Sequence, residues 1–271
     1  MSWIITGTQR YQPAALLDQF PGAAAAYSLR NLVGTSNPSV VRVRRDNDDA
    51  EQDFTATEVS DGTLAEWGGA GNNGFVRTWY DQSGNNRHAF NTTTSTQPRI
   101  VLNGSIELES GKACLRFFSG AVLDTGFTGL VEKSLFAVAK LDSPRSSGRL
   151  LTSFAGSGGV GNELLADRGG SSFRLIDGGM SVTCSLTTGR KVLYASRSAT
   201  LLSVGVNSAA LTQASISNTA ANTRNYAIGE DIPAVFIEYP DSIQEIVLYP
   251  SDQLVNRISI EANINSHYSI F

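Results

Sequence analysis

Two groups of polar side chains have the chemistry of a sugar-binding site. Asp81, Asn85 and Asn86 follow an aromatic-rich stretch, and Tyr239 lies close to Asp231 in the chain. Carboxylates and amides bond sugar hydroxyls, and an exposed aromatic ring stacks on a sugar, when they line a concave surface. These residues are our candidate carbohydrate contacts. The alternative is that they are ordinary polar residues of turns and loops.

An acidic run that begins at Asp46 is the candidate for metal binding. Asp46, Asp48 and Asp53 bring together carboxylate oxygens, the ligands that calcium prefers. The spacing departs from an EF-hand loop, because Ala50 replaces the third ligand and Glu51 replaces the obligatory glycine. We therefore expect no cofactor and a solvated acidic turn paired with the preceding arginines, with Ca²⁺ binding as the alternative.

The cysteines and histidines are too few for several common sites. Cys114 and Cys184 form no Cys-x-x-Cys pair, and the only histidines are His88 and His267, which excludes the usual zinc clusters and a disulfide-dense scaffold. We expect two buried thiols, with a single bridge between them as the alternative. The serine nucleophile elbow, the phosphate-binding loop and the dinucleotide fingerprint are also absent.

Composition limits the partners and the compartment. The net charge of −4 gives no field that would attract nucleic acid. No run approaches the roughly 18 apolar residues of a membrane helix, so we expect no membrane insertion. Residues 1–7 lack a basic leader followed by a long apolar run, which predicts synthesis in a cytosol without a signal peptide.

The elements that must position these residues are mostly strands. Apolar residues make up 41% of the chain and there are 26 glycines against 8 prolines, which favours one domain of short strands joined by glycine turns. Turn signals recur at roughly the 8–12-residue spacing of an all-β sandwich. We expect strands at residues 40–45, 74–80, 98–102, 113–117, 135–140, 150–154, 163–167, 173–176, 182–186, 191–196, 201–206 and 243–249.

The two ends of the chain differ from this pattern. Residues 1–22 are apolar but irregular, and we expect an arm that packs on the domain or on a neighbouring subunit, with the domain itself at 23–271. Alanines and leucines at 23–33 predict a short helix, and residues 63–67 a single helical turn. A last helix is expected from a cap at Ser251, with its packed face at Leu254, Val255, Ile258, Ala262 and Ile264. The arm's candidate assembly contacts are Trp3, Ile4, Ile5 and Tyr11.

Three stretches together resemble a known module. The matching residues are 26–30 followed by 41–45 and 48–54, then 74–86, then 245–253 with 261–265. In this order they are similar to the concanavalin A-like jelly roll of fungal α-L-arabinofuranosidase B enzymes and of many phage virion and bacterial surface proteins. The resemblance covers roughly residues 23–268. It implies a jelly-roll β-sandwich with a short N-terminal arm, a short helix near the N-terminus and a C-terminal helix. One fold of this kind serves many functions.

The resemblance also raises the question of catalysis. Residues 228–231 look like the family segment that carries the general acid, which would make Asp231 that residue. Retaining hydrolysis needs a second carboxyl group about 5 Å away. In the family the nucleophile follows two adjacent cysteines, a run that this chain lacks, and the surroundings of Glu163 do not match it. We therefore expect no enzymatic activity.

These inferences lead to one expected function and two alternatives. The resemblance implies a non-enzymatic structural protein of a phage virion, in the tail, fibre, baseplate or capsid decoration. Its lectin-like domain would serve assembly or attachment to host-surface polysaccharide. Family members of this kind form rings, so we expect a homo-oligomer or contacts with other virion proteins. The alternatives are a carbohydrate-binding module of a surface protein and a divergent arabinofuranosidase.

Overall fold

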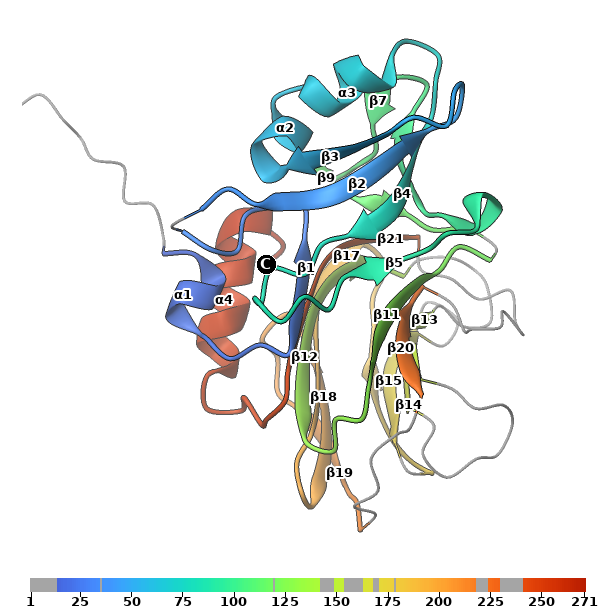
Figure 1. The fold of residues 1–271 in the computed structure, drawn as a ribbon. Coiled ribbons are helices and arrows are strands. Elements are labelled where there is room, and N and C mark those ends of the chain that lie inside the picture. Colours follow the sequence, from blue (N-terminus) through green and yellow to red (C-terminus); the bar gives the residue numbers. More distant parts are fainter. Residues whose placement is uncertain are drawn as a thin grey trace, which may run out of the picture.

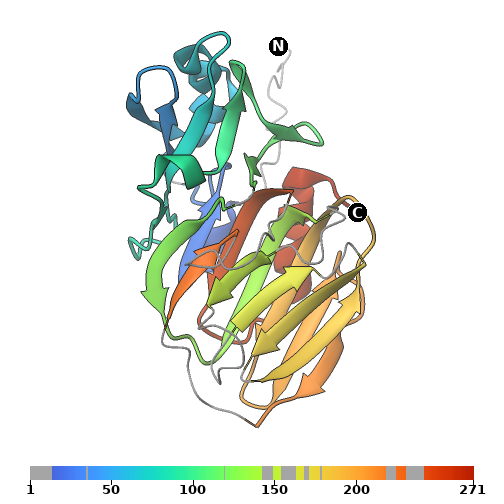
Figure 2. The same cartoon turned by 90° about the vertical axis from the view of Figure 1, so that its right-hand side faces the viewer.

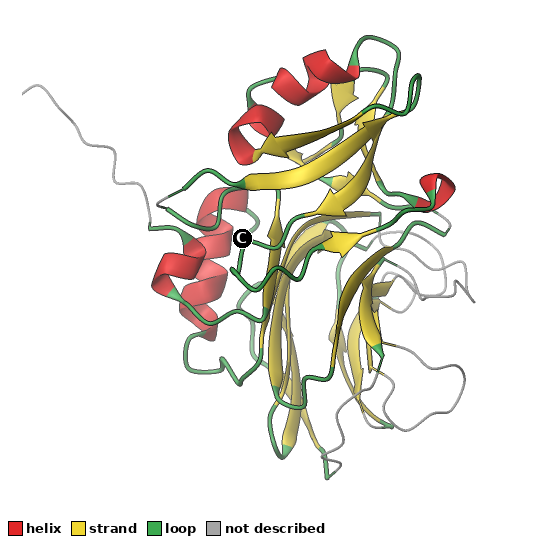
Figure 3. Cartoon of the chain, viewed as in Figure 1, coloured by secondary structure: helices red, strands yellow, loops and turns green. Residues whose placement is uncertain are grey.

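Strands dominate the chain and form stacked layers (Figure 1). The computed structural model describes residues 14–34, 36–118, 120–141, 149–153, 163–167, 171–177, 179–217, 224–229 and 241–271. Two sheets make the larger body, a smaller layer lies beyond one end of it, and helices occupy the margins (Figure 3). This is the predicted all-β class of a lectin-like β-sandwich.

The first sheet is antiparallel and has the order β19-β18-β17-β12-β21-β1. Strand β21, between β12 and β1, is buried on both faces. The strands are β1 (Ala25–Ser28), β12 (Lys133–Lys140), β17 (Arg190–Arg197), β18 (Leu201–Val206), β19 (Thr212–Ser215) and β21 (Ser242–Tyr249).

Alternation along β12 shows why this sheet is covered on both sides. Leu135 and Ala137 belong to the main core between the sheets, whereas Phe136 and Val138 belong to a second cluster on the outer face. Successive side chains of a strand point to opposite faces, so an unbroken apolar run is stable only where both faces are covered.

The second sheet continues the antiparallel pattern in the order β16-β15-β14-β13-β20-β11. Phe173, Leu175 and Tyr226 from this sheet meet the inner face of the first in the main core. Figure 2 looks onto the broad faces of the two sheets, and Figure 1 shows them closer to edge on. The strands are β11 (Leu123–Thr128), β13 (Arg149–Ser153), β14 (Glu163–Asp167), β15 (Ser172–Asp177), β16 (Met180–Ser185) and β20 (Asn225–Ile228).

The smaller layer has the strand order β3-β2-β4-β6-β7 and carries two short helices. Two short strands join it to the body, since β5 pairs with β4 and β11 and β10 pairs with β6 and β21. The elements are β2 (Ser39–Arg45), β3 (Glu51–Thr55), α2 (Ala56–Ser60), α3 (Thr63–Gly68), β4 (Gly74–Trp79), β5 (Ala89–Phe90), the 3₁₀ turn Thr94–Thr96, β6 (Arg99–Leu102), β7 (Ser105–Ile106), the hairpin β8 (Leu108–Glu109) and β9 (Lys112–Ala113), and β10 (Leu115–Arg116).

Two helices cover the outer face of the first sheet (Figure 1). Ile260 and Ile264 of α4 (Arg257–Tyr268) pack on Phe136, Tyr194 and Val247, and α1 (Leu16–Gln19) lies against α4. The rest of the buried face of α4 is polar, and its charges are paired within the fold. Arg257, for example, donates from Nε to Glu261 at 2.9 Å.

The helix predicted at residues 23–33 is wrong. Ala25 and Ala26 lie in β1, fully buried and paired with Leu248 and Val247 of β21. Alanine has high helix propensity, but propensity is a weak prior that tertiary packing overrides. The short helix near the N-terminus is α1 instead.

The predicted start of the last helix is also wrong, and of the five residues of its predicted face only Ile264 is buried. Residue 256 precedes the first helical residue, and Ser251 forms a bend instead of a cap. Val255 is 92% exposed, and Leu254, Ile258 and Ala262 are exposed as well. The polar side chains on the buried face hid its orientation from a search for apolar periodicity. The single helical turn predicted at 63–67 is confirmed as α3.

The described part of the N-terminal arm packs on this chain. Leu16 and Leu17 are buried in the cluster beside α4, and the Tyr249 hydroxyl donates to the carbonyl of Phe20 at 2.7 Å. Trp3, Ile4, Ile5 and Tyr11 lie outside the described residues, so their assembly contacts stay a prediction. Among the helices that the structure describes, none has the length and apolar character to cross a bilayer.

The cysteines lie in separate elements and are not bridged. Cys114 is buried between β9 and β10, and Cys184 is half-buried in β16. Burial raises the pKa of the Cys114 thiol to about 12 and also raises the pKa of Cys184. Both residues are thiols, as predicted, although Cys184 is less buried than expected.

Candidate functional site

The loop after β4 is tied to the start of β1. The Asp81 carboxylate is 9% exposed and accepts hydrogen bonds from the backbone N–H groups of Ala26, Ser83 and Arg87 at 2.8, 2.9 and 3.1 Å. Asn85 donates from its amide to the carbonyl of Ala23 at 2.9 Å. Both side chains therefore hold the loop in place. Their role as sugar contacts stays a prediction.

Other predicted sugar contacts differ in their surroundings. Asn86 is exposed at the tip of the same loop, with a positive φ of 56°. Asp231 and Tyr239 lie outside the described residues, so neither the sugar-binding nor the general-acid role of Asp231 is tested. Glu163 is the first residue of β14 and its backbone pairs with Ser153 of β13.

The three candidate metal ligands of the acidic run each bind a different side chain. Asp48 pairs with Arg45 at 2.6 Å, Asp53 pairs with Arg42 at 2.7 Å, and Asp46 accepts from the amide of Asn73 at 2.8 Å. Hydrogen bonds from these arginines lower the pKa of Asp48 and of Asp53. Within the described ranges, no three His, Cys, Asp or Glu side chains converge as metal ligands. Pairing with arginines is confirmed, and Ca²⁺ binding stays a prediction.

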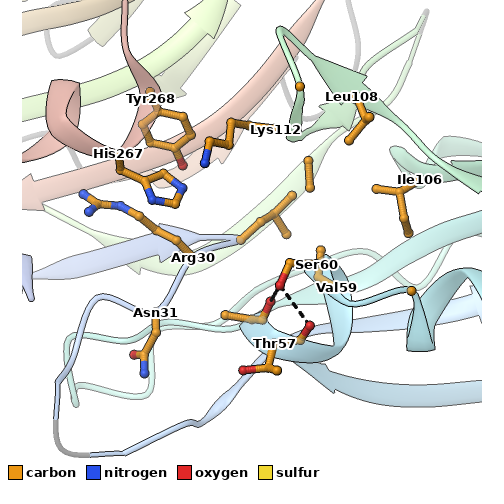
Figure 4. Close-up of a pocket in the computed structure, with 15 residues that line it drawn as sticks. Arg30, Asn31, Thr57, Val59, Ser60, Ile106, Leu108, Lys112, His267 and Tyr268 are labelled. Carbon is orange, nitrogen blue, oxygen red and sulfur yellow. Dashed lines mark hydrogen bonds between the residues drawn. The ribbon is translucent and has the colours of Figure 1, made fainter. Parts of the chain in front are cut away.

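The candidate functional site is a pocket of about 570 Å³ between α2, the β8–β9 hairpin and the end of α4 (Figure 4). This volume lies in the range of about 300–1,000 Å³ that is usual for ligand sites. The pocket is lined by Leu29, Arg30, Asn31, Ala56, Thr57, Val59, Ser60, Gly62, Ile106, Leu108, Gly111, Lys112, Ala113, His267 and Tyr268.

One wall of the pocket is basic. In Figure 4, Arg30, Lys112 and His267 lie together on the side of Tyr268. Arg30 follows β1, Lys112 belongs to β9 and His267 to the last turn of α4. Strand pairing of β1 with β21 and docking of α4 therefore bring together basic groups that are far apart in sequence.

Arg30 is held in place by a buried carboxylate. It donates to Glu245 from Nε at 2.7 Å and from Nη2 at 2.9 Å, and from Nη1 to Asn263 at 3.2 Å. Burial by itself raises the pKa of Glu245, but the charge and hydrogen bonds of Arg30 leave it lowered. Glu245 is therefore an anion whose charge is matched inside the fold.

His267 lies in a positive field. Burial lowers its pKa, and the charges of Arg30, Lys112 and Arg190 lower it further, to about 4. Glu245 is the one acid that acts in the opposite direction. The imidazole is therefore neutral near pH 7 and can donate one hydrogen bond and accept another.

The opposite wall combines apolar and hydroxyl groups. Val59 of α2 and Ile106 of β7 supply apolar surface, and Leu108 is 54% exposed. Thr57 and Ser60 lie on the same helix, where Thr55 caps the first turn in a capping box with Glu58. Apolar surface with a few fixed polar groups is typical of small-molecule sites.

A second pocket of about 480 Å³ adjoins the first. Arg30, Asn31 and His267 line both, and the second continues past Val33 to Asn263. The two pockets therefore meet at the Arg30 side chain.

None of the pocket's polar residues was among the predicted site residues. They come from separate segments of the chain, at 29–31, 56–62, 106–113 and 267–268. The signals in the sequence were the family-like stretch that ends at Arg30 and the rarity of histidine, of which His267 is one of two. Neither signal indicates that the groups meet.

The fold and the pocket together define the class: a lectin-like β-sandwich with a polar hollow beside its C-terminal helix. A solved α-L-arabinofuranosidase of glycoside hydrolase family 54, soaked with a cyclic sulfate inhibitor, matches with a TM-score of 0.69 at 15% identity, over 89% of this chain and 62% of that one. An arabinofuranosidase complexed with arabinofuranosyl-α-1,2-xylobiose matches with a TM-score of 0.65 at 15% identity, over 92% and 64%.

These similarities establish the shared fold. The chain spans less than two thirds of the length of either arabinofuranosidase. Neither the family models nor the curated protein sequences contain a match to this chain.

Proposed function

We propose that this chain is a non-catalytic carbohydrate-binding domain whose glycan lies in the pocket between α2 and α4. The observation that carries the proposal is the pocket itself, in which apolar surface at Val59 and Ile106 faces the polar groups of Arg30, Lys112 and His267. A sugar presents apolar C–H faces and polar hydroxyl edges, so such a cavity fits its chemistry.

The chemistry of the lining supports binding without catalysis. Among the described residues that line this pocket, none is Asp or Glu. Glycoside hydrolysis in most families needs a pair of carboxyl groups beside the scissile bond. The chain also lacks the adjacent cysteines that precede the nucleophile in the similar arabinofuranosidase family.

A glycan array followed by calorimetry tests the proposal. Ser60 is exposed on α2 and lines the pocket, so Ser60→Tyr fills the pocket without entering the core. We expect it to reduce affinity for the selected glycan at least about tenfold, which is 1.4 kcal/mol. Ser181→Tyr, at an exposed position of β16, is the matched control. Absence of any glycan ligand, or equal binding by both variants, contradicts the proposal.

The divergent arabinofuranosidase is tested separately. Hydrolysis of 4-nitrophenyl α-L-arabinofuranoside that is abolished by Asp231→Asn or Glu163→Gln would support that alternative. We expect no turnover above the uncatalysed rate. Any Asp231-dependent turnover contradicts the non-catalytic proposal.

The second candidate function is a structural role in a phage virion. In this role the chain would form a homo-oligomer and attach to the host surface. Its support is the motif resemblance together with the exposed apolar side chains of Leu254, Val255 and Ile258 before and within α4. Adjacent exposed apolar residues mark contact surfaces, and a second copy of this chain is the expected occupant. Light scattering should show an oligomer that Val255→Glu dissociates; a monomer at every concentration contradicts this role.

A further inference from the structure

We infer that the sugar bound in this pocket carries a carboxylate, as a uronic acid does, and that its charge lies between Lys112 and His267. This inference rests on the proposed carbohydrate-binding function and adds the chemical class of the ligand. It follows from the balance of charge around the pocket, from the unused ammonium of Lys112 and from the position of His267.

The charges that face the pocket are positive. Lys112 and the guanidinium of Arg30 line it, and Arg190 lies behind Tyr268 with its guanidinium carbon 5.7 Å from the ring centroid. Glu245, the acid that binds Arg30, is fully buried. An anionic ligand therefore meets an attractive field that a neutral sugar does not use.

Nearby acids outside the lining already have partners. Glu109 of β8 lies within 3.6 Å of Arg116 and 3.7 Å of Lys140. Glu107 pairs with Arg99 at 2.5 Å. Neither acid forms an ion pair with Lys112 in the part of the chain that the structure describes.

Lys112 has a fixed backbone and an unused head group. Gln244 donates from its amide to the carbonyls of Lys112 and Ala113 at 3.0 and 3.1 Å, which anchors the β8–β9 hairpin to β21. Among the described residues, the Lys112 ammonium makes no hydrogen bond or ion pair. A ligand carboxylate can therefore pair with it without breaking an existing contact.

His267 supplies a second, neutral donor on the same wall. Because its low pKa comes from burial and from the surrounding cations, a bound anion would offset part of that field. The pKa of His267 should then rise on binding from its value of about 4, and by linkage the affinity should rise as His267 takes up its proton at acid pH. His88, which lies beside Tyr80 and outside the pocket, is the internal control.

The decisive experiment compares each ligand with its own neutral form. Binding of uronate trisaccharides, such as trigalacturonate, is measured by calorimetry beside their methyl esters, for the wild type and for Lys112→Gln, Lys112→Arg and Lys191→Gln. Lys191 lies outside the pocket and donates to the carbonyl of Thr188, so its substitution makes the same charge change elsewhere. NMR titration of both histidines gives the second readout.

We expect a free uronate to bind about tenfold or more tightly than its ester, the worth of one charge-assisted hydrogen bond. Lys112→Gln should remove that preference, while Lys112→Arg and Lys191→Gln keep it. The pKa of His267 should rise on binding and that of His88 should not. Equal binding of acid and ester, or a preference that survives Lys112→Gln, overturns the inference.

The outcomes distinguish a failure of this inference from a failure of the carbohydrate-binding function on which it rests. If a neutral glycan binds and Ser60→Tyr abolishes its binding, the carbohydrate-binding proposal holds and the acidic ligand is refuted. If no glycan of either kind binds, both fall. An unchanged melting temperature in each variant shows that the fold is intact.

Discussion

Replacing Glu245 by glutamine is expected to destabilise the fold by about 3 kcal/mol. The Glu245 carboxylate has no exposed surface and accepts hydrogen bonds from Arg30, from the Ser28 hydroxyl at 2.8 Å and from the Tyr268 hydroxyl at 3.3 Å. It thus joins β1, β21 and α4 at one point. Glutamine keeps the volume but removes the charge and one acceptor.

The magnitude follows from the burial of the pair. Removing one partner of a buried ion pair costs about 3–5 kcal/mol, because the other charge is left without compensation. The Arg30 side chain is 13% exposed at the edge of the pocket, so water can reach part of the guanidinium. The lower end of that range is therefore expected.

The pH dependence supplies a second check on the same residue. Since the pKa of Glu245 is lowered from its usual 4.5, the unfolded state binds its proton first as the pH falls. The stabilising contribution is present above pH 4.5 and is lost as the pH falls through the folded-state value. The stability difference between wild type and Glu245→Gln should therefore be constant at neutral pH and shrink only in acid.

Urea unfolding followed by tryptophan fluorescence measures the effect, because Trp79 is fully buried in the main core. Glu51→Gln is the control. Its pair with Arg77 has an N–O distance of 3.2 Å and both side chains are about one third exposed, so its removal should cost about 0–1 kcal/mol. A loss for Glu245→Gln below about 1 kcal/mol, or equal to that for Glu51→Gln, would refute the reasoning.

Three further predictions concern single residues. The pKa of His267 is lowered to about 4, so as the pH falls the unfolded state binds this proton before the folded state does. The free energy of unfolding should therefore decrease between pH 6.5 and pH 4. In His267→Gln, the midpoint of urea unfolding should depend less on pH over this range. Asp81→Ala leaves the buried N–H of Ala26 without its acceptor and should lower the unfolding free energy by about 2 kcal/mol. In native protein at pH 8, Ellman's reagent should label Cys184 before the fully buried Cys114, and equal rates would contradict the burial argument.

The longest strands, β12, β17 and β21, were predictable because their signals are local, whereas β3, β11, β19 and β20 were not predicted. The buried side chains of β12 alternate between the two faces of the sheet, and turn residues lie on either side of the strand. The same pattern recurs in β17 and β18. A strand needs only side chains that suit a pleated buried surface and a turn at each end. Trp79 of β4, in an aromatic-rich strand, is fully buried in the same way.

The failures occurred where distant contacts outweigh local preference. Ala25 and Ala26 favour a helix in isolation, yet pairing with β21 makes them a strand. On α4 the buried side chains include Arg257 and Glu261, which are compatible with burial only because each neutralises the other. A search for apolar spacing selects Val255 instead, which faces solvent. The pocket was not predicted for the same reason, because its polar residues come from separate segments of the chain.

The structure distinguishes two roles within the basic wall. Arg30 is committed to Glu245 and Asn263, so it shapes the junction of the two pockets and keeps it rigid. Lys112 and His267 are not committed to a buried ion pair of this kind, and their polar ends remain available to a ligand. A change at Glu245 should therefore lower stability and glycan affinity together, because it releases Arg30. A change at Lys112 should lower affinity alone. If Lys112→Gln lowered the melting temperature as much as Glu245→Gln, Lys112 would belong to the scaffold and not to the site.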